Sequence, residues 1–117
     1  MVSDSILKKR INPAHLLLEK HMNELNQEYV KEYLFHHTRR WRFDYLLCDQ
    51  PECLTSVAIE IEGAIWSRGR HTRGKGFQAD LDKYNTATMM GYRVLRFSTE
   101  DVMRGRAKAF LAEHLKG

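Results

Sequence analysis

The feature that most constrains the fold is an alternation of side-chain character with a period of two in the middle of the sequence. Aromatic and aliphatic side chains occupy every second position over 41–47, and Val57, Ile59 and Ile61 repeat the pattern further on. Successive side chains of a β-strand point to opposite faces of a sheet, so both segments are predicted to be strands. The DQPE sequence at 49–52 is typical of a turn, and 29–35 is rich in β-prone residues. We expect three antiparallel strands joined by short turns over 29–62.

A helix is expected before these strands. Asn12 can cap the free N–H groups of a helix start, and Pro13 suits the first helical position. Apolar residues then recur at helical spacing as far as Leu25. These signals predict a helix over 13–25.

A second helix is expected after the glycine-rich segment 63–76. Phe77, Leu81, Tyr84 and Thr88 fall on one helical face, and Gly91 suits the position that ends a helix. The segment 63–76 has no periodicity and is predicted to be a loop.

A short strand and a last helix complete the prediction. The segment 92–97 has strand character, and Ser98 with Asp101 resembles a capping box that begins a helix running to about Leu115. The order α-β-β-β-α-β-α predicts an α/β (α+β) fold in a single domain over 1–117. We assign the following apolar positions to the core: Leu17, Leu18, Phe43, Tyr45, Val57, Ile59, Ile61, Leu81, Val94, Leu95 and Phe97.

Size and composition narrow the class of protein. A chain of 117 residues can form one core, and 43% hydrophobic with 29% charged residues is typical of a folded globular protein. No apolar run approaches the roughly 20 residues that span a bilayer, and the N-terminal sequence lacks the apolar stretch of a secretion signal. We therefore expect a cytoplasmic protein without a membrane partner. The net charge of +4 is compatible with a nucleic-acid partner.

Acidic residues inside the predicted strands are the strongest indication of chemistry. Asp44 lies among aromatic residues, and Glu60 and Glu62 share one face of the next strand. Carboxylates are poor strand formers and costly to bury, and a divalent cation would offset their repulsion. Mg²⁺ held there could polarise a phosphodiester and supply hydroxide. The alternative is a solvated face for both glutamates, with Asp44 paired to an arginine such as Arg42.

Basic clusters flank these acids. Exposed glycine backbone and cationic side chains suit phosphate contacts, although a charge run is more often simply a solvated face. Trp66 would stack on an unpaired base or pack as a lid over the core. The candidate DNA-binding residues are Arg39, Arg40, Arg68, Arg70, Arg73 and Lys75.

The order of motifs resembles the PD-(D/E)xK, or restriction-endonuclease-like, nucleases. RRWRFDYLL, VAIEIEG, a G-x-H loop and DLDKYNTATMMGYRVLRF follow one another as in small phage and bacterial endonuclease-like proteins. That group is similar to the catalytic domain of very-short-patch repair endonucleases. The resemblance covers about residues 13–105 and implies a restriction-endonuclease-like αβββαβ core with a C-terminal helix. It also implies metal ligation by Asp44 and Glu60, with Glu19 on the first helix as a further acid.

The sequence departs from this family where a lysine is usual, because the tripeptide at 60–62 is ExE. Glu62 would then help or replace the missing lysine. Lys83, at a position where the related group carries a basic residue, could reach the scissile phosphate; otherwise it faces solvent and pairs with Asp80 or Asp82. His71 would be a general base or phosphate contact by resemblance, or one more cationic loop residue.

These features lead to a metal-dependent endodeoxyribonuclease as the expected function. Mg²⁺ is the expected cofactor, with Mn²⁺ able to substitute, and DNA is the expected partner. Cutting both strands would need two sites, which suggests a homodimer. The alternative, motivated by the ExE departure, is a catalytically inactive nuclease-fold protein that binds branched or mismatched DNA. A third reading is an interaction domain for protein partners.

Overall fold

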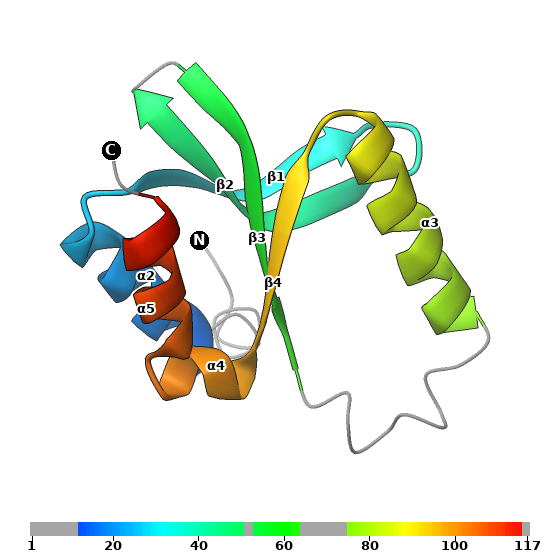
Figure 1. The fold of residues 1–117 in the computed structure, drawn as a ribbon. Coiled ribbons are helices and arrows are strands. Elements are labelled where there is room, and N and C mark those ends of the chain that lie inside the picture. The colour runs from blue at the N-terminus through cyan, green and yellow to red at the C-terminus, as the bar shows by residue number, and fades with distance from the viewer. Residues whose placement is uncertain (1–11, 51–52, 64–74, 116–117) are drawn as a thin grey trace, which may run out of the picture.

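The chain forms a four-stranded mixed sheet with helices on both faces (Figure 1). The computed structural model describes residues 12–50, 53–63 and 75–115. The elements are α2 (Pro13–Glu24), β1 (Glu28–His36), β2 (Trp41–Gln50), β3 (Cys53–Glu62), α3 (Lys75–Met89), β4 (Arg93–Ser98), α4 (Thr99–Met103) and α5 (Arg106–His114). The mixed α/β architecture expected from the sequence is confirmed, and the order of elements agrees as far as β4.

The strand order is β1-β2-β3-β4. β1, β2 and β3 pair antiparallel, whereas β4 pairs parallel to β3 after the crossover that contains α3. The helix α2 begins as the sequence predicts, because the Asn12 side chain accepts the N–H of Ala14 and Pro13 occupies the first turn.

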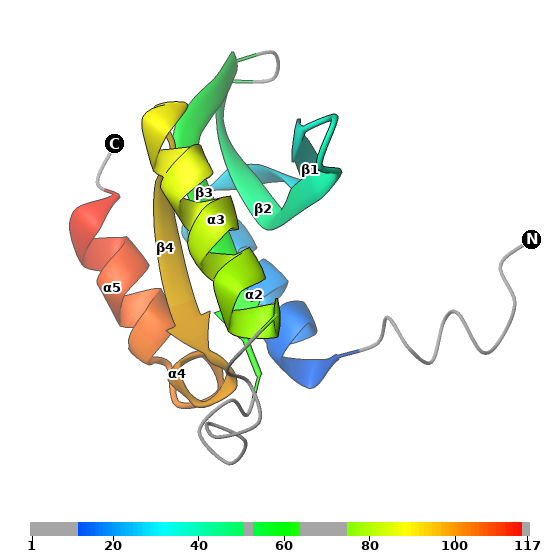
Figure 2. The ribbon, with the colours of Figure 1, turned by 90° about the vertical axis from the view of Figure 1, so that its right-hand side faces the viewer.

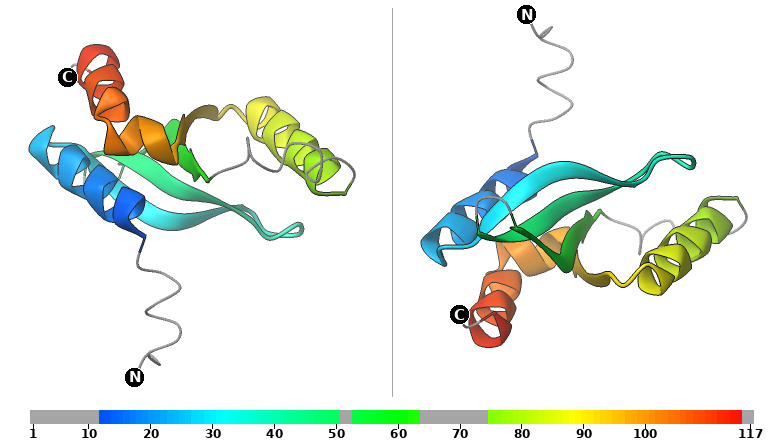
Figure 3. Two further views of the ribbon diagram at one scale, coloured as in Figure 1. Left: turned by 90° about the horizontal axis from the view of Figure 1, so that it is seen from below. Right: turned by 90° about the horizontal axis from the view of Figure 1, so that it is seen from above.

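Two apolar clusters lie on the two faces of the sheet. Helices α2, α4 and α5 cover one face, where Leu18, Val102 and Leu111 pack on Ile59 and Phe97. Helix α3 covers the other face through Ala87, in a cluster with Phe35, Phe43, Leu46 and Ala58 (Figures 1 and 2). The end of the β1–β2 hairpin and α3 extend to the same side of the molecule, away from α2 and α5 (Figure 3).

The inward face of α3 differs from the prediction. Phe77 and Leu81 are 52% and 41% exposed, and Thr88 is exposed as well, so the assignment of Leu81 to the core is wrong. The side of α3 that faces the sheet carries Lys83 and Tyr84 together with Ala87. Polar side chains occupy the inner face because they meet an acidic site on β3, which helical periodicity alone does not reveal.

The last helix is also interrupted. The capping box of Ser98 and Asp101 forms as expected and begins α4, but this helix ends after five residues. Gly105 then adopts a left-handed conformation with φ of 80° before α5 begins. The single helix expected as far as Leu115 is therefore two helices joined by a sharp bend.

The longest described helix has 15 residues, which falls short of the roughly 20 apolar residues that a bilayer crossing requires.

Candidate active site

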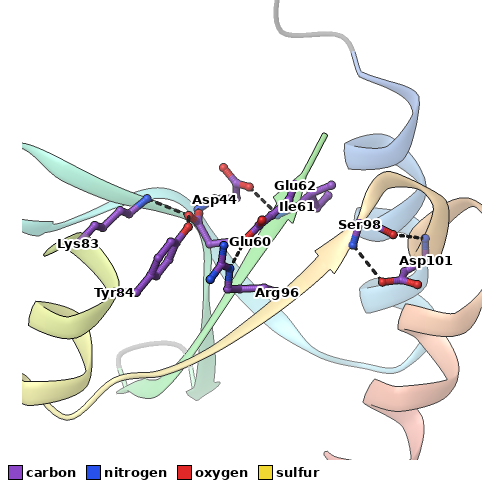
Figure 4. Close-up of polar contacts among 9 residues, drawn as sticks. All are labelled: Asp44, Glu60, Ile61, Glu62, Lys83, Tyr84, Arg96, Ser98 and Asp101. Carbon is purple, nitrogen blue, oxygen red and sulfur yellow. Dashed lines mark hydrogen bonds and ion pairs between the residues drawn. The ribbon is translucent and has the colours of Figure 1, made fainter. Parts of the chain in front are cut away.

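The two acids expected at the centre of the site lie side by side on neighbouring strands. In the antiparallel register of β2 and β3, Tyr45 is the partner of Ile59. Asp44 and Glu60 are the next residues on the two strands, so they lie opposite each other. Both acids line one cavity. The Asp44 N–H donates to Oε2 of Glu60, and the Ile61 N–H donates to Oδ2 of Asp44, both at 2.8 Å (Figure 4). The two carboxylates therefore lie on one side of the sheet, as a shared site requires.

The reciprocal bonds have a local cause in the sheet. Of the described β2–β3 partners, Tyr45 and Ile59 are the last pair before this end of the ladder. Beyond them the N–H groups of Asp44 and Ile61 need other acceptors, since an unpaired backbone donor inside a protein is costly. The two carboxylates accept them in charge-assisted bonds. Divergence of the strands therefore fixes the orientation of both acids.

Glu60 is buried, with 6% of its surface exposed. Its Oε1 accepts from Nζ of Lys83 at 2.8 Å and from the hydroxyl of Tyr84 at 2.6 Å, while Oε2 accepts from Asp44. Burying a carboxylate is tolerated when it is paired and fully hydrogen-bonded, and Glu60 meets both conditions. The alternative of a solvated face is therefore wrong for Glu60.

Lys83 reaches the site from α3, and its side chain is 17% exposed. Its ion pair with Glu60 excludes the alternative of a solvent-facing lysine held by Asp80 or Asp82; Asp82 instead accepts from Gln78. Helix α3 thus places a basic group directly at the Glu60 carboxylate.

The pKa of Asp44 is raised above the ordinary aspartate value. Burial is the main cause, and the negative charge of Glu60 adds to it, while the hydrogen bond from the Ile61 N–H acts in the opposite direction. Arg42 does not relieve this charge through a bond to Asp44; its guanidinium donates to the carbonyl oxygen of Glu32. Asp44 is accordingly an acid whose ionised form would gain from a nearby cation.

Glu62 has a partner that the sequence analysis did not predict. It forms a close ion pair with Arg96 of β4, whose guanidinium also lies 4.2 Å from the ring centroid of Tyr84 (Figure 4). The Arg96 pKa is raised by this contact with Glu62. Glu62 is therefore engaged with a neighbouring strand, whereas Glu60 is engaged with α3.

A cavity of about 500 Å³ opens above the acids. Arg40, Trp41 and Arg42 of the β1–β2 hairpin line one side, and Lys83 and Tyr84 of α3 line the other. We call this space the central cleft. Its floor is acidic and its sides carry cations, an arrangement that suits an anionic chain and a metal ion at once.

Glu19 lies in a second cavity of about 320 Å³, which shares Asp44 with the central cleft. The Tyr45 hydroxyl donates to Oε2 of Glu19 at 2.7 Å, and Lys31 lies 3.6 Å from Oε1. His15 Nδ1 is 3.2 Å from the same hydroxyl. Both oxygens of Glu19 thus have protein partners.

The expected ligands Glu19, Asp44 and Glu60 are divided between these two cavities. Within the described ranges, no three His, Cys, Asp or Glu side chains converge on a point that would hold a metal. Asp44 and Glu60 together nevertheless fit Mg²⁺, which is commonly held by one or two carboxylates, with substrate phosphates and water completing its shell.

Several predicted residues fall outside the part of the chain that the structure describes: His71, Arg68, Arg70, Arg73 and Trp66. Lys75 begins α3, but its side chain is not described. Arg39 and Arg40 lie at the turn of the β1–β2 hairpin. The Arg39 guanidinium lies 4.5 Å from the ring centroid of Trp41, and Arg40 lines the central cleft.

Four further residues at the site were not singled out as functional from the sequence. His15 and Tyr45 line the second cavity, Tyr84 lines the central cleft, and Arg96 pairs with Glu62. Tyr45 and Tyr84 occupy apolar positions in their periodic patterns, and only the three-dimensional packing shows that their hydroxyls bond acids. Burial and these acids raise the pKa of both hydroxyls, so each remains a donor. For Arg96 the sequence held no signal, because its place beside Glu60 follows from the pairing of β4 with β3.

Comparison with known proteins identifies a relative in fold. A solved structure described as the catalytic domain of the homing endonuclease I-Bth0305I aligns with a TM-score of 0.63 and 19% sequence identity. The alignment covers 91% of this chain and 99% of that domain. At this level of identity the likeness supports the shared fold. No family model matches the chain, and no curated protein matches it either.

Proposed function

We propose that the protein is a metal-dependent endonuclease that hydrolyses phosphodiester bonds in DNA. The observation that carries this proposal is the juxtaposition of Asp44, Glu60 and Lys83 in the central cleft. The fold shared with a protein described as an endonuclease catalytic domain supports it. So does the sequence resemblance to the PD-(D/E)xK nucleases.

Asp44 and Glu60 are the proposed ligands of Mg²⁺ or Mn²⁺. The bound ion would neutralise charge on the phosphate and lower the pKa of a coordinated water. Glu19 lines the second cavity and not the central cleft, so we place it outside the ligand pair.

Lys83 takes the place of the lysine that the ExE tripeptide lacks. Its Nζ lies 2.8 Å from Glu60 and faces the cleft, where it can bind an oxygen of the scissile phosphate. His71 remains our prediction for a general base.

The basic side chains at the hairpin end are the proposed contacts to the DNA backbone. Arg40 and Arg42 line the cleft beside the acids, where they can bind phosphates on either side of the scissile bond. Because the described residues of one chain form one such site, cleavage of both strands would require two chains.

Replacement of Asp44 tests the function. Purified protein is incubated with supercoiled plasmid and Mg²⁺ or Mn²⁺, and nicking is followed on agarose gels. A metal ion contributes several kcal/mol to phosphoryl-transfer transition states and about 1.4 kcal/mol is tenfold in rate, so Asp44→Asn should slow nicking by roughly a hundredfold or more. Asp82→Asn is the matched control, because Asp82 bonds Gln78 on α3, and it should retain the wild-type rate. Equal nicking by wild type and Asp44→Asn would exclude the proposed site.

A protein of the same fold that binds DNA without cutting it is the second candidate. The observation that favours it is that both carboxylate oxygens of Glu60 already accept hydrogen bonds, Oε1 from Lys83 and Tyr84 and Oε2 from the Asp44 N–H. A metal ligated by Glu60 would compete with these donors. This candidate predicts retained DNA binding with no nicking in either metal. A wild-type protein that behaves in this way would replace the endonuclease proposal.

A further inference from the structure

Arg96 of the last strand lies next to the two glutamates of β3. In the parallel register of β3 and β4, Glu60 is the partner of Arg96 and Glu62 the partner of Ser98. Paired residues of neighbouring strands project to the same face of the sheet, so Arg96 lies on the face of the two glutamates. The guanidinium pairs with Glu62 and lies over the ring of Tyr84 (Figure 4).

Tyr84 connects this arginine to the proposed metal ligand. Its ring receives the guanidinium at 4.2 Å, and its hydroxyl donates to Oε1 of Glu60 at 2.6 Å. The contacts form a continuous series from Glu62 through Arg96 and Tyr84 to Glu60. The Arg96 guanidinium has a fixed planar geometry that suits both a carboxylate and an aromatic face.

We propose that Arg96, anchored by Glu62, is a positioning residue that acts through Tyr84 to hold the Glu60 carboxylate beside Asp44. Glu62 then contributes to cleavage through Arg96 and contacts neither the metal nor the phosphate. This inference rests on the proposed function of Asp44 and Glu60. It assigns the second glutamate of the ExE tripeptide a role different from the replacement of lysine.

The geometry favours this role over direct action by Glu62. The side chain of Glu62 is 18% exposed and its Oε2 is held by Arg96, whereas Lys83 already supplies the cation at Glu60. Loss of Arg96 would release Tyr84 as well as Glu62. The hydroxyl that fixes one orientation of Glu60 would then be free to move.

A double-mutant cycle separates the two roles. The kinetic constants kcat and KM are measured with Mg²⁺ on plasmid DNA for wild type, Glu62→Gln, Arg96→Met and the double variant. If Glu62 acts only through Arg96, each single change should lower kcat about tenfold with KM nearly unchanged, and the double variant should be no slower than the slower single one. If Glu62→Gln lowers kcat by the same factor with or without Arg96, Glu62 acts directly and the inference is overturned.

Two further variants test the connection through Tyr84. Tyr84→Phe keeps the ring under Arg96 but removes the donor to Glu60, so it should lower kcat to the same extent as Arg96→Met. Arg96→Lys should recover part of the lost rate, because it keeps the charge beside Glu62. Full activity of Tyr84→Phe would overturn the inference. Arg104→Met is the matched control, since Arg104 pairs with Glu100 on α4, and its kcat should equal that of wild type.

Calorimetric titration with Mn²⁺ in the absence of DNA tests the positioning role without measuring cleavage. The single variants should bind Mn²⁺ more weakly than wild type, and the double variant no more weakly than the weaker single one. If the wild type nicks DNA but the effects of the two single changes add in the double variant, the positioning role is contradicted and the nuclease proposal stays in place. A wild-type protein that binds Mn²⁺ but cuts nothing contradicts the nuclease proposal, and the Mn²⁺ cycle then decides the positioning role. Absence of both Mn²⁺ binding and cleavage in the wild type overturns both.

Discussion

At the scale of single residues, the site exists because buried carboxylates are held in place by specific donors. Asp44 and Glu60 accept backbone N–H groups that the diverging strands leave free, and Glu60 also accepts from Lys83. Asp44 and Glu60 were predictable because charged residues stand out in an apolar strand pattern. Lys83 was predicted only from the resemblance to small endonuclease-like proteins. Tyr84 and Arg96 were not predictable, because their roles depend on how α3 and β4 lie against β3.

The raised pKa of Asp44 predicts a stability cost that the proposed metal would relieve. When the folded-state pKa lies above the unfolded one, ionisation destabilises the folded protein as pH rises from the unfolded value, and the full cost is reached above the folded value. Asp44→Asn lacks this cost, and its amide oxygen can still accept from Ile61. In EDTA it should melt at a higher temperature than wild type at pH 7, and the difference should shrink as the pH falls towards the ordinary aspartate pKa.

Thermal melts over a pH series, with EDTA or with Mg²⁺, check this prediction. Mg²⁺ should raise the melting temperature of wild type and leave that of Asp44→Asn unchanged, because a ligand stabilises only the state that binds it. A lower melting temperature for Asp44→Asn at pH 7 in EDTA would show that the ionised carboxylate is a net stabiliser.

At the scale of elements, the sequence predicted the features that depend only on neighbouring residues, such as strands and the starts of helices. Alternation defined the strands, Asn12 and Pro13 defined the start of α2, and Ser98 with Asp101 defined the start of α4. The break before α5 was missed because Gly within a helical pattern is tolerated, and only packing of α4 and α5 on the sheet shows that the chain must bend there.

Gly105 should therefore be the more sensitive of two glycines to alanine. Its φ of 80° is costly for a residue with a Cβ atom, although the surrounding space is open, so Gly105→Ala should lower the free energy of unfolding by about 1–2 kcal/mol. Gly76 lies in the first turn of α3 without a positive φ, so Gly76→Ala should leave stability unchanged or increase it by up to about 1 kcal/mol. Chemical denaturation of both variants measures the difference. An equal change in the free energy of unfolding for the two variants would contradict the left-handed bend between α4 and α5.

At the scale of the whole molecule, the sheet separates two kinds of surface. Helices α2, α4 and α5 close one face around an apolar core, and α3 and the hairpin end extend away from α2 and α5 (Figure 3). Residues of α3 and of the hairpin end line the central cleft. The sequence predicted the elements but not this arrangement, because the walls of the cleft come from segments about 40 residues apart, Arg40–Arg42 and Lys83–Tyr84. Basic side chains beside an acidic floor place the expected phosphate contacts at the hairpin.

The salt dependence of DNA binding tests this placement. Each phosphate contact releases counterions, so the logarithm of the binding constant should fall linearly with the logarithm of salt concentration, by about 0.9 per contact on duplex DNA. Arg40→Gln should weaken binding at low salt and reduce that slope by about 1. Arg104→Gln should change neither, since Arg104 lies on α4, which packs on the other face of the sheet, and pairs with Glu100.

Fluorescence anisotropy of a labelled duplex in EDTA, over a series of salt concentrations, measures both quantities without cleavage. A wild-type slope near zero would contradict phosphate contacts altogether and favour a domain that binds other proteins, whereas equal slopes for wild type and Arg40→Gln would move the DNA path away from the hairpin.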